Sequence, residues 1–116
     1  MVYLAASPAG ALLEILAHLE LKGGDTPLTY TLLRISVPDR LRIPDLPVPE
    51  AWKNDEGISR KIGDLWLESK RSALARVPSV ILPHTFNYLL NPMHPDAARI
   101  SIAEAYRGPL DLRLLR

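Results

Sequence analysis

The sequence predicts an α+β domain with a small mixed sheet and two main helices. The apolar residues change their spacing along the chain in the order strand, helix, strand, helix, strands, which indicates a mixed α and β domain. The length of 116 residues is enough for one domain and too short for two. Hydrophobic residues make up 47% and charged residues 23%, so the chain has an ordinary globular composition. We therefore expect a single domain over residues 1–116.

The first expected elements are a strand and the helix that follows it. Val2–Ala5 is typical of a strand, and Ser7-Pro8 then supplies an N-cap serine and a proline at the first helical position. Gly23-Gly24 is expected to end this helix, because glycine takes the left-handed conformation at little steric cost. The helix is expected to bury the apolar residues at helical spacing, which are Leu12, Ile15, Leu16 and Leu19.

A second strand and a proline-rich connection follow. Residues Leu28–Val37 alternate with period two, with a register shift after Leu32, and Thr29 and Thr31 add β-branched side chains. Four of the 11 prolines then fall between residues 38 and 49. A helix or a central strand cannot run through so many prolines, so this stretch is expected to cross the surface as a long loop within the domain.

The second helix is expected to start at a cap on Ser59 and to fade near Ser69. Its apolar stripe is formed by Ile58, Ile62, Leu65 and Trp66. The next apolar run, Leu74–Leu82, predicts a strand, and Pro78 within it indicates a bend or an edge position.

The last third of the chain predicts turns and one more strand. Residues 87–95 contain Asn-Pro and His-Pro pairs, which favour turns. Arg99–Ala103 predicts a strand, and a break at Gly108-Pro109 then precedes a short apolar tail, Leu110–Leu115.

Composition excludes several classes of protein. The formal net charge of +1 gives no field that favours nucleic acid or an anionic membrane as the partner. The chain has no cysteine, so it offers no disulfide, no thiolate nucleophile and no cysteine zinc site, which fits a reducing compartment. No apolar run reaches the roughly 18 residues that a membrane-spanning helix needs.

A few polar residues are candidates for chemistry. Glu14 and His18 lie four residues apart and project from the same side of the first helix, either as a pair facing a cleft or as a weak pair on a solvated face. Ser79 is a single polar residue in an apolar run; it is a nucleophile only with a base that the sequence does not show, and otherwise bonds to nearby backbone. The three histidines match no common zinc spacing, so no metal site is expected, and His94 is expected to hold a turn.

Three stretches carry a more specific signal when they are taken together. The first is VYLAASP with ALLE, at residues 2–8 and 11–14, and the second is IGDLW, at residues 62–66. The third and most specific is VPSVILP, at residues 77–83, continuing to NYLLNPMHPD at residues 87–96. In this combination the chain resembles the RES domain family, the toxin component of RES–Xre toxin–antitoxin pairs. The resemblance implies an ADP-ribosyltransferase-like fold and cleavage of NAD between nicotinamide and ribose.

The family is named for an arginine, a glutamate and a serine. Glu14 matches the glutamate, 11 residues after the strand tyrosine of the family, which is Tyr3 here, and Ser79 matches the serine. The arginine belongs before that tyrosine, where this chain has only Met1 and Val2. The chain is therefore expected to be N-terminally truncated, either because it begins downstream of the true start or because it is a shortened member.

The resemblance implies a role for each matched residue. Glu14 would stabilise the oxocarbenium-like charge on the ribose and hold a ribose hydroxyl. Tyr3 would stack on the nicotinamide or orient it, Ser79 would bond the nicotinamide amide or a ribose oxygen, and Asn87 would support the NAD pocket rather than react. The missing arginine would pair with the pyrophosphate. Its candidate substitutes are Arg34, Arg40 and Arg42.

Two functions follow from this resemblance. The first is an NAD-consuming toxin of a type II toxin–antitoxin system, acting as a glycohydrolase, a phosphorylase or an ADP-ribosyltransferase, with NAD as its substrate and no cofactor. The second is a catalytically impaired RES remnant that binds an antitoxin as an interaction module. The implied partners are NAD, an Xre-family antitoxin and further copies of the chain, in the cytoplasm and without direct contact to nucleic acid or membrane. An unrelated α+β binding domain is the remaining alternative.

Overall fold

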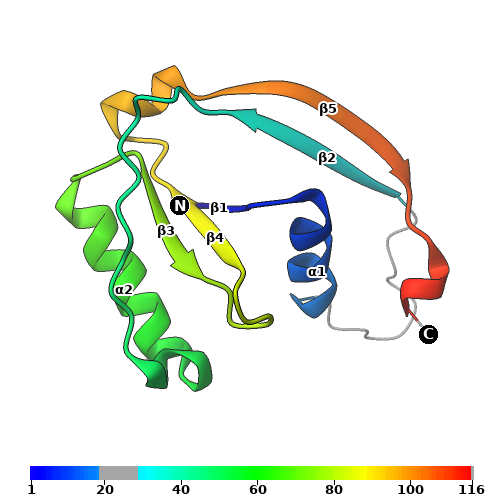
Figure 1. Cartoon of the computed structure of the whole chain (residues 1–116), viewed down its shortest axis with the longest axis horizontal. Coiled ribbons are helices and arrows are strands. Elements are labelled where there is room, and N and C mark those ends of the chain that lie inside the picture. Colours follow the sequence, from blue (N-terminus) through cyan, green and yellow to red (C-terminus); the bar gives the residue numbers. More distant parts are fainter. Residues whose placement is uncertain (19–28, 116) are drawn as a thin grey trace.

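Residues 1–18 and 29–115 are described by the computed structural model, and their mixed secondary structure confirms the predicted α+β class (Figure 1). The strands are β1 (Val2–Ala5), β2 (Thr29–Ser36), β3 (Leu74–Pro78), β4 (Phe86–Leu90) and β5 (Ser101–Pro109). The helices are α1 (Pro8–His18) and α2 (Glu56–Ser69), with short 3-10 helices η1 (Glu50–Asn54), η2 (Pro95–Arg99) and η3 (Leu112–Leu115). Within these ranges, no helix has the length and apolarity needed to cross a membrane.

Both helices begin at a side chain that caps their first turn. The Ser7 Oγ accepts a hydrogen bond of 3.0 Å from the Gly10 N–H, as expected for the cap of α1. The Asp55 Oδ1 caps α2 and accepts from the N–H groups of residues 57 and 58, at 2.8 and 3.3 Å. The expectation of Ser59 as this cap was wrong, because the carboxylate of Asp55 already satisfies those N–H groups one residue before the helix. The expected end of α1 at Gly23-Gly24 lies outside the described residues.

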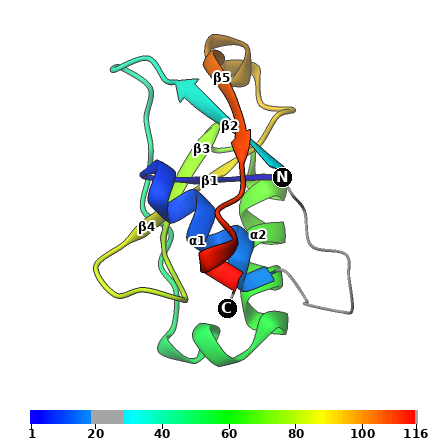
Figure 2. The same cartoon turned by 90° about the vertical axis from the view of Figure 1, so that its right-hand side faces the viewer.

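Three strands form an antiparallel sheet in the order β1-β4-β3. Tyr3 is opposite Leu89 and Leu89 is opposite Ala75, so these three side chains lie on one face of the sheet. Trp66 of α2 packs on Leu89 and Ala75, and both helices lie on this side of the sheet (Figures 1 and 2). We call it the helix face; by register its side chains are Tyr3, Ala5, Ala75, Val77, Asn87 and Leu89.

The opposite face of the sheet carries a second small core. Leu74 is 1% exposed and packs with the buried Leu41, which comes from the proline-rich loop. Leu4, Val37, Leu90, Ala97 and Ile100 surround this pair. The sheet is therefore covered on one face by helices and on the other by the loop and η2.

The strand β4 corrects the expectation of turns over residues 87–95. It pairs with β1 on one side and β3 on the other, which makes it the central strand. The turn signals begin only after it, at Asn91-Pro92, because an extended strand needs no turn residues of its own. The run expected from Leu74 to Leu82 ends as a strand at Pro78, since proline cannot donate to a further ladder bond.

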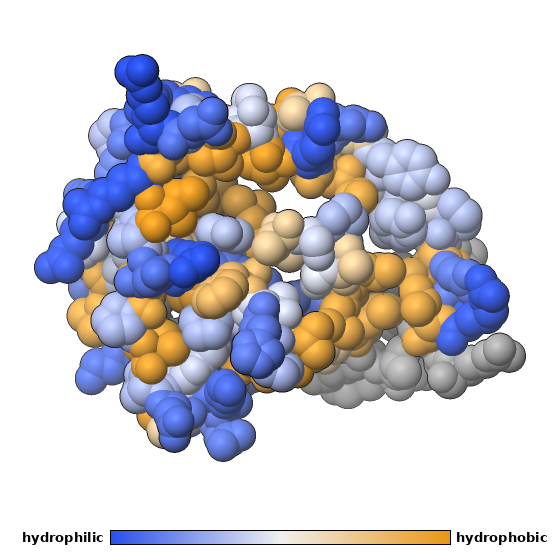
Figure 3. Space-filling view, in the orientation of Figure 1, coloured by the Kyte–Doolittle hydropathy of each residue, from blue (hydrophilic) through white to orange (hydrophobic). Residues whose placement is uncertain are grey.

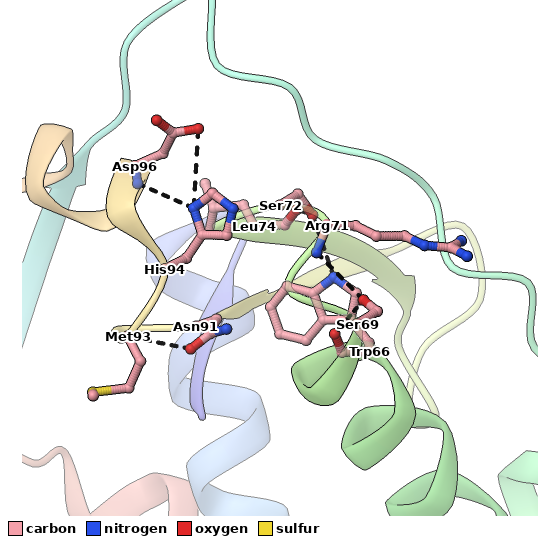
Figure 4. Close-up of polar contacts among 9 residues, drawn as sticks. All are labelled: Trp66, Ser69, Arg71, Ser72, Leu74, Asn91, Met93, His94 and Asp96. Carbon is pink, nitrogen blue, oxygen red and sulfur yellow. Dashed lines mark hydrogen bonds and ion pairs between the residues drawn. The ribbon is translucent and has the colours of Figure 1, made fainter.

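The segment from Asn91 to Asp96 forms a corner between β4 and η2 (Figure 4). The Asn91 Oδ1 accepts from the Met93 N–H at 3.0 Å, and the His94 Nδ1 accepts from the Asp96 N–H at 3.0 Å. This confirms the turn role expected for His94. Residues 91–96 belong to the stretch that most specifically indicated the RES family. Two side chains of this segment fix its turn by hydrogen bonds to N–H groups of the same segment.

The proline-rich segment 38–49 runs as an extended connection, as expected, and it also pairs with the outer edge of β3. The Arg76 N–H donates to the Pro44 carbonyl at 2.9 Å, and the Leu46 N–H donates to the Arg76 carbonyl at 3.0 Å. These two bonds make a single parallel bridge between Asp45 and Arg76. The bridge covers an edge of the sheet that would otherwise be open.

The remaining strands, β2 and β5, pair only with each other within the described residues and form an antiparallel ribbon above the sheet (Figures 1 and 2). A register shift between Arg34 and Ile35 interrupts the pairing. The strand expected at Arg99–Ala103 is longer, because β5 continues through the expected break. Gly108 permits this continuation: a Cβ there would lie 2.8 Å from the ring of Tyr106, which covers the glycine.

Candidate functional site

The position of Glu14 follows from the close approach of α1 to β1. A Cβ on Gly10 would lie 3.6 Å from the Ala5 Cβ, at van der Waals contact, so a side chain larger than alanine at this position would meet the strand. Glu14 comes four residues after Gly10 and therefore projects from the same side of the helix. Ala5 is paired with Asn87 across the sheet, which brings Glu14 to Asn87 on the helix face.

The structure brings together three of the residues that the RES resemblance singled out. The Glu14 Oε1 accepts a hydrogen bond from the Ser79 hydroxyl at 2.8 Å and another from the Asn87 Nδ2 at 2.8 Å. Ser79 is 4% exposed, and the other two side chains are half-buried. We call Glu14, Ser79 and Asn87 the Glu14 site. Its members come from α1, the turn after β3, and β4.

The hydroxyl of Ser79 has all of its hydrogen-bonding capacity in use. Its oxygen accepts from the N–H groups of Ile81 and Leu82, at 3.1 and 3.3 Å. A serine hydroxyl has one hydrogen to donate and two lone pairs, so its hydrogen is directed to Glu14. Ser79 therefore bonds to nearby backbone, as one of the two expectations had it, and it also donates a hydrogen bond to the Glu14 carboxylate.

Tyr3 shares the helix face but makes no hydrogen bond to the Glu14 site. Its side chain is 70% exposed. Leu89, its partner across the sheet, is two residues from Asn87, so Tyr3 and Asn87 are diagonal neighbours on one face. The aromatic ring thus lies open to solvent on the same face as the carboxylate contact.

His18 does not form the pair with the Glu14 carboxylate that the helical spacing offers. Its Nδ1 lies 2.7 Å from the backbone carbonyl oxygen of Glu14, so the imidazole engages the main chain. Ile15, which was expected in the buried stripe of this helix, is 58% exposed. That expectation was wrong because α1 meets the sheet along the narrow side that bears Gly10 and Glu14. In the ranges that the structure describes, no three metal-ligating side chains gather.

The candidate substitutes for the family arginine lie elsewhere. Arg34 pairs with Glu104 across the ribbon at 3.5 Å, and both side chains are exposed. Arg40 and Arg42 are exposed in the proline-rich segment. A shallow cavity of about 300 Å³ lies beside the register shift of the ribbon and is lined by Arg34, Ile35, Ser36 and Ala103. No member of the Glu14 site lines it.

Two features that build the site are not among the residues predicted from the sequence. One is Gly10, whose place four residues before Glu14 could have indicated a close approach of helix and strand. The other is the pair of backbone N–H groups after Ser79, which a Ser-x-x turn could have indicated.

Fold and site together define a class: a small α+β domain in which a serine and an asparagine hold one helix carboxylate against a sheet. The family model for the RES domain matches residues 1–112. The chain therefore belongs to the RES domain family.

Similar proteins carry toxin names. The chain is 43% identical over 103 residues to a protein named Toxin Res from Pseudomonas putida, covering 88% of this chain and 71% of that protein. It is 38% identical over 125 residues to a Prs ADP-ribosylating toxin from Sphingobium sp., covering 100% and 75%. It is also 37% identical over 121 residues to a Toxin Res from Photorhabdus laumondii, covering 99% and 76%.

Proposed function

We propose that this chain is a RES toxin that cleaves the bond between nicotinamide and ribose in NAD. The observation that carries the proposal is the Glu14 carboxylate, which two donors hold at 2.8 Å through Oε1 alone. Among the residues that the structure describes, none hydrogen-bonds to Oε2, so that oxygen is available to a ligand. Membership of the RES family and the toxin names of its relatives support the same reading.

The chemistry needs a fixed negative charge beside the sugar. When the N-glycosidic bond breaks, its electron pair leaves with nicotinamide and positive charge develops on the ribose, as at other glycosidic centres. A carboxylate held in place stabilises that charge and accepts a hydrogen bond from a ribose hydroxyl. We assign this role to Glu14, and we assign stacking on the nicotinamide to the exposed ring of Tyr3.

The acceptor of the ADP-ribosyl group is water, phosphate or a protein side chain. The name of the Sphingobium relative, an ADP-ribosylating toxin, favours transfer of the ADP-ribosyl group over hydrolysis. We further propose that the toxin works in the cytoplasm as part of a type II toxin–antitoxin system, and that an Xre-family antitoxin neutralises it.

The test is release of nicotinamide from NAD by the folded chain, followed with and without phosphate. We expect Glu14→Gln to reduce the rate by about 100-fold or more, because the amide keeps the size of the side chain and loses its charge. Glu104→Gln is the matched control, since Glu104 is an exposed glutamate on β5. A folded chain without turnover, or full activity of Glu14→Gln, would refute the proposal.

The second candidate is an impaired RES domain that binds an antitoxin without cleaving NAD. One observation favours it: Arg34, a candidate substitute for the family arginine, pairs with Glu104 across the ribbon. The same assay separates the two candidates. Tight binding of an Xre-family antitoxin by a chain that releases no nicotinamide would establish the second.

A further inference from the structure

We propose that Asn87 is a positioning residue, which selects Oε2 of Glu14 as the oxygen that meets the substrate. The inference rests on the proposed function of the Glu14 site. Asn87 and Ser79 both donate to Oε1, at 2.8 Å each, from different elements of the fold. Oε1 is thereby occupied from two directions, and Oε2 is the oxygen left for a ribose hydroxyl.

Two donors are needed because the end of a glutamate side chain turns easily. The last torsion of glutamate is broad, so a single donor would leave the carboxylate free to rotate about that one contact. Ser79 alone fixes a point of contact; Asn87 adds a second direction and defines the plane of the carboxylate. In the described structure no lysine or arginine pairs with this carboxylate, so these neutral donors set its orientation.

The burial of Asn87 shows that its amide is kept at a cost. Its Oδ1 is buried and has no hydrogen-bond partner among the described residues. A buried acceptor without a partner is destabilising. Across the sheet Asn87 stands between Ala5 and Val77, and an apolar side chain in this slot would avoid the cost. We therefore assign the role of the amide to the hydrogen bond that Nδ2 donates to Glu14.

The first experiment separates positioning from direct contact with NAD. Asn87→Ala should lower kcat for nicotinamide release by about tenfold or more and change KM for NAD by less than about twofold, because only the carboxylate loses a contact. Its melting temperature should be unchanged or higher, since the buried unpaired oxygen is removed as well. A raised KM with unchanged kcat would overturn the proposal and make Asn87 a direct NAD contact.

The second experiment uses the charge of the neighbouring group. Asn87→Asp places a carboxylate against Oε1, and two carboxylates at that distance resist being ionised together. The other titratable side chains near the site are Tyr3 on β1, His18 on α1 and His84 on the turn between β3 and β4, and none of the three hydrogen-bonds to the carboxylate. We expect the pH–rate profile to move to higher pH in Asn87→Asp and to stay in place in Asn54→Asp, an exposed control. An unmoved profile would count against the contact.

The third experiment does not depend on catalysis. The side-chain amide resonances of Asn87, identified by their loss in Asn87→Ala, should shift in Glu14→Gln and not in Glu104→Gln. No response to Glu14→Gln would overturn the inference. A wild type without turnover would refute the proposed function, and the amide resonances would still decide whether Asn87 holds Glu14.

Discussion

Among individual residues, Asp45 and Arg76 make a two-point ion pair that ties the proline-rich segment to β3. The Arg76 Nε lies 2.5 Å from the Asp45 Oδ1, and its Nη2 lies 3.1 Å from Oδ2. The guanidinium also sits over the ring of Phe86, 4.1 Å from its centre. The hydrogen bond from Arg76 lowers the pKa of Asp45, and desolvation opposes this effect.

The pair predicts a pH-dependent contribution to stability. A lowered carboxyl pKa in the folded state stabilises the fold above the ordinary carboxyl pKa, and this contribution is lost as the pH falls through the lowered value. Asp45→Asn should therefore lower the melting temperature near neutral pH, and its difference from wild type should fade in acid. Asp64→Asn, at an exposed carboxylate on α2, is the control. A difference that persists unchanged in acid would contradict the prediction.

The sequence identifies the members of the Glu14 site through their resemblance to a family and not through their spacing. Spacing points to Glu14 with His18, because helical neighbours are the pairs that a sequence shows directly. Ser79 and Asn87 lie 65 and 73 residues beyond Glu14. Their meeting depends on the register of β4 with β1 and on the path of α1, which local patterns do not determine.

Among the elements, α1 depends on a close approach to β1 at Gly10. Its start is predictable because Ser7 and Pro8 are typical residues at a helix N-terminus, and Ser7 caps the first turn. Its buried side is not predictable from apolar spacing, since Ile15 faces solvent while Glu14 faces the sheet. The turn residues that follow β4 led to a prediction of turns over the whole region. The strand forms because it pairs with β1 on one side and with β3 on the other.

The approach of α1 to β1 can be tested by filling the space at Gly10. Gly10→Leu should push the helix away from Ala5, draw Glu14 away from the sheet, and reduce nicotinamide release by about tenfold or more. Overpacking should also lower the melting temperature by about 4 °C or more. Ala9→Leu adds the same side chain at an exposed neighbouring position and should change little. Equal effects of the two substitutions would contradict this account of the helix.

Across the whole molecule, the ribbon of β2 and β5 stands apart from the sheet and its helices. Figure 3 shows an opening between the ribbon and the turn from β1 to α1. The radius of gyration is 15.4 Å, above the roughly 13 Å expected for a compact chain of this length. Exposed apolar side chains on the ribbon include Leu33, Ile102 and Tyr106. The sequence predicts part of each strand. It does not predict that the two strands form a sheet of their own, because strand pairing between distant segments is not visible in local patterns.

This architecture predicts uneven protection from hydrogen exchange. A two-stranded ribbon is marginally stable without further packing, so its amides should open more often than those of a central strand. We expect the amides of β2 and β5 to exchange faster than those of β4, which serves as the internal reference. Equal protection of the ribbon and β4 would show that the ribbon is held more firmly than its contacts indicate.

The Ser79 hydroxyl has a consequence for how this protein evolves. The same oxygen that directs its hydrogen to Glu14 receives the main-chain N–H groups of Ile81 and Leu82. Val80, Ile81 and Leu82 present exposed apolar side chains on that turn. Insertions or deletions that change the path of the turn would break the hydrogen bond from Ser79 to the Glu14 carboxylate. Substitutions of the outward side chains would leave it in place. We therefore expect relatives of this protein to differ in the outward side chains of the turn and to keep its length.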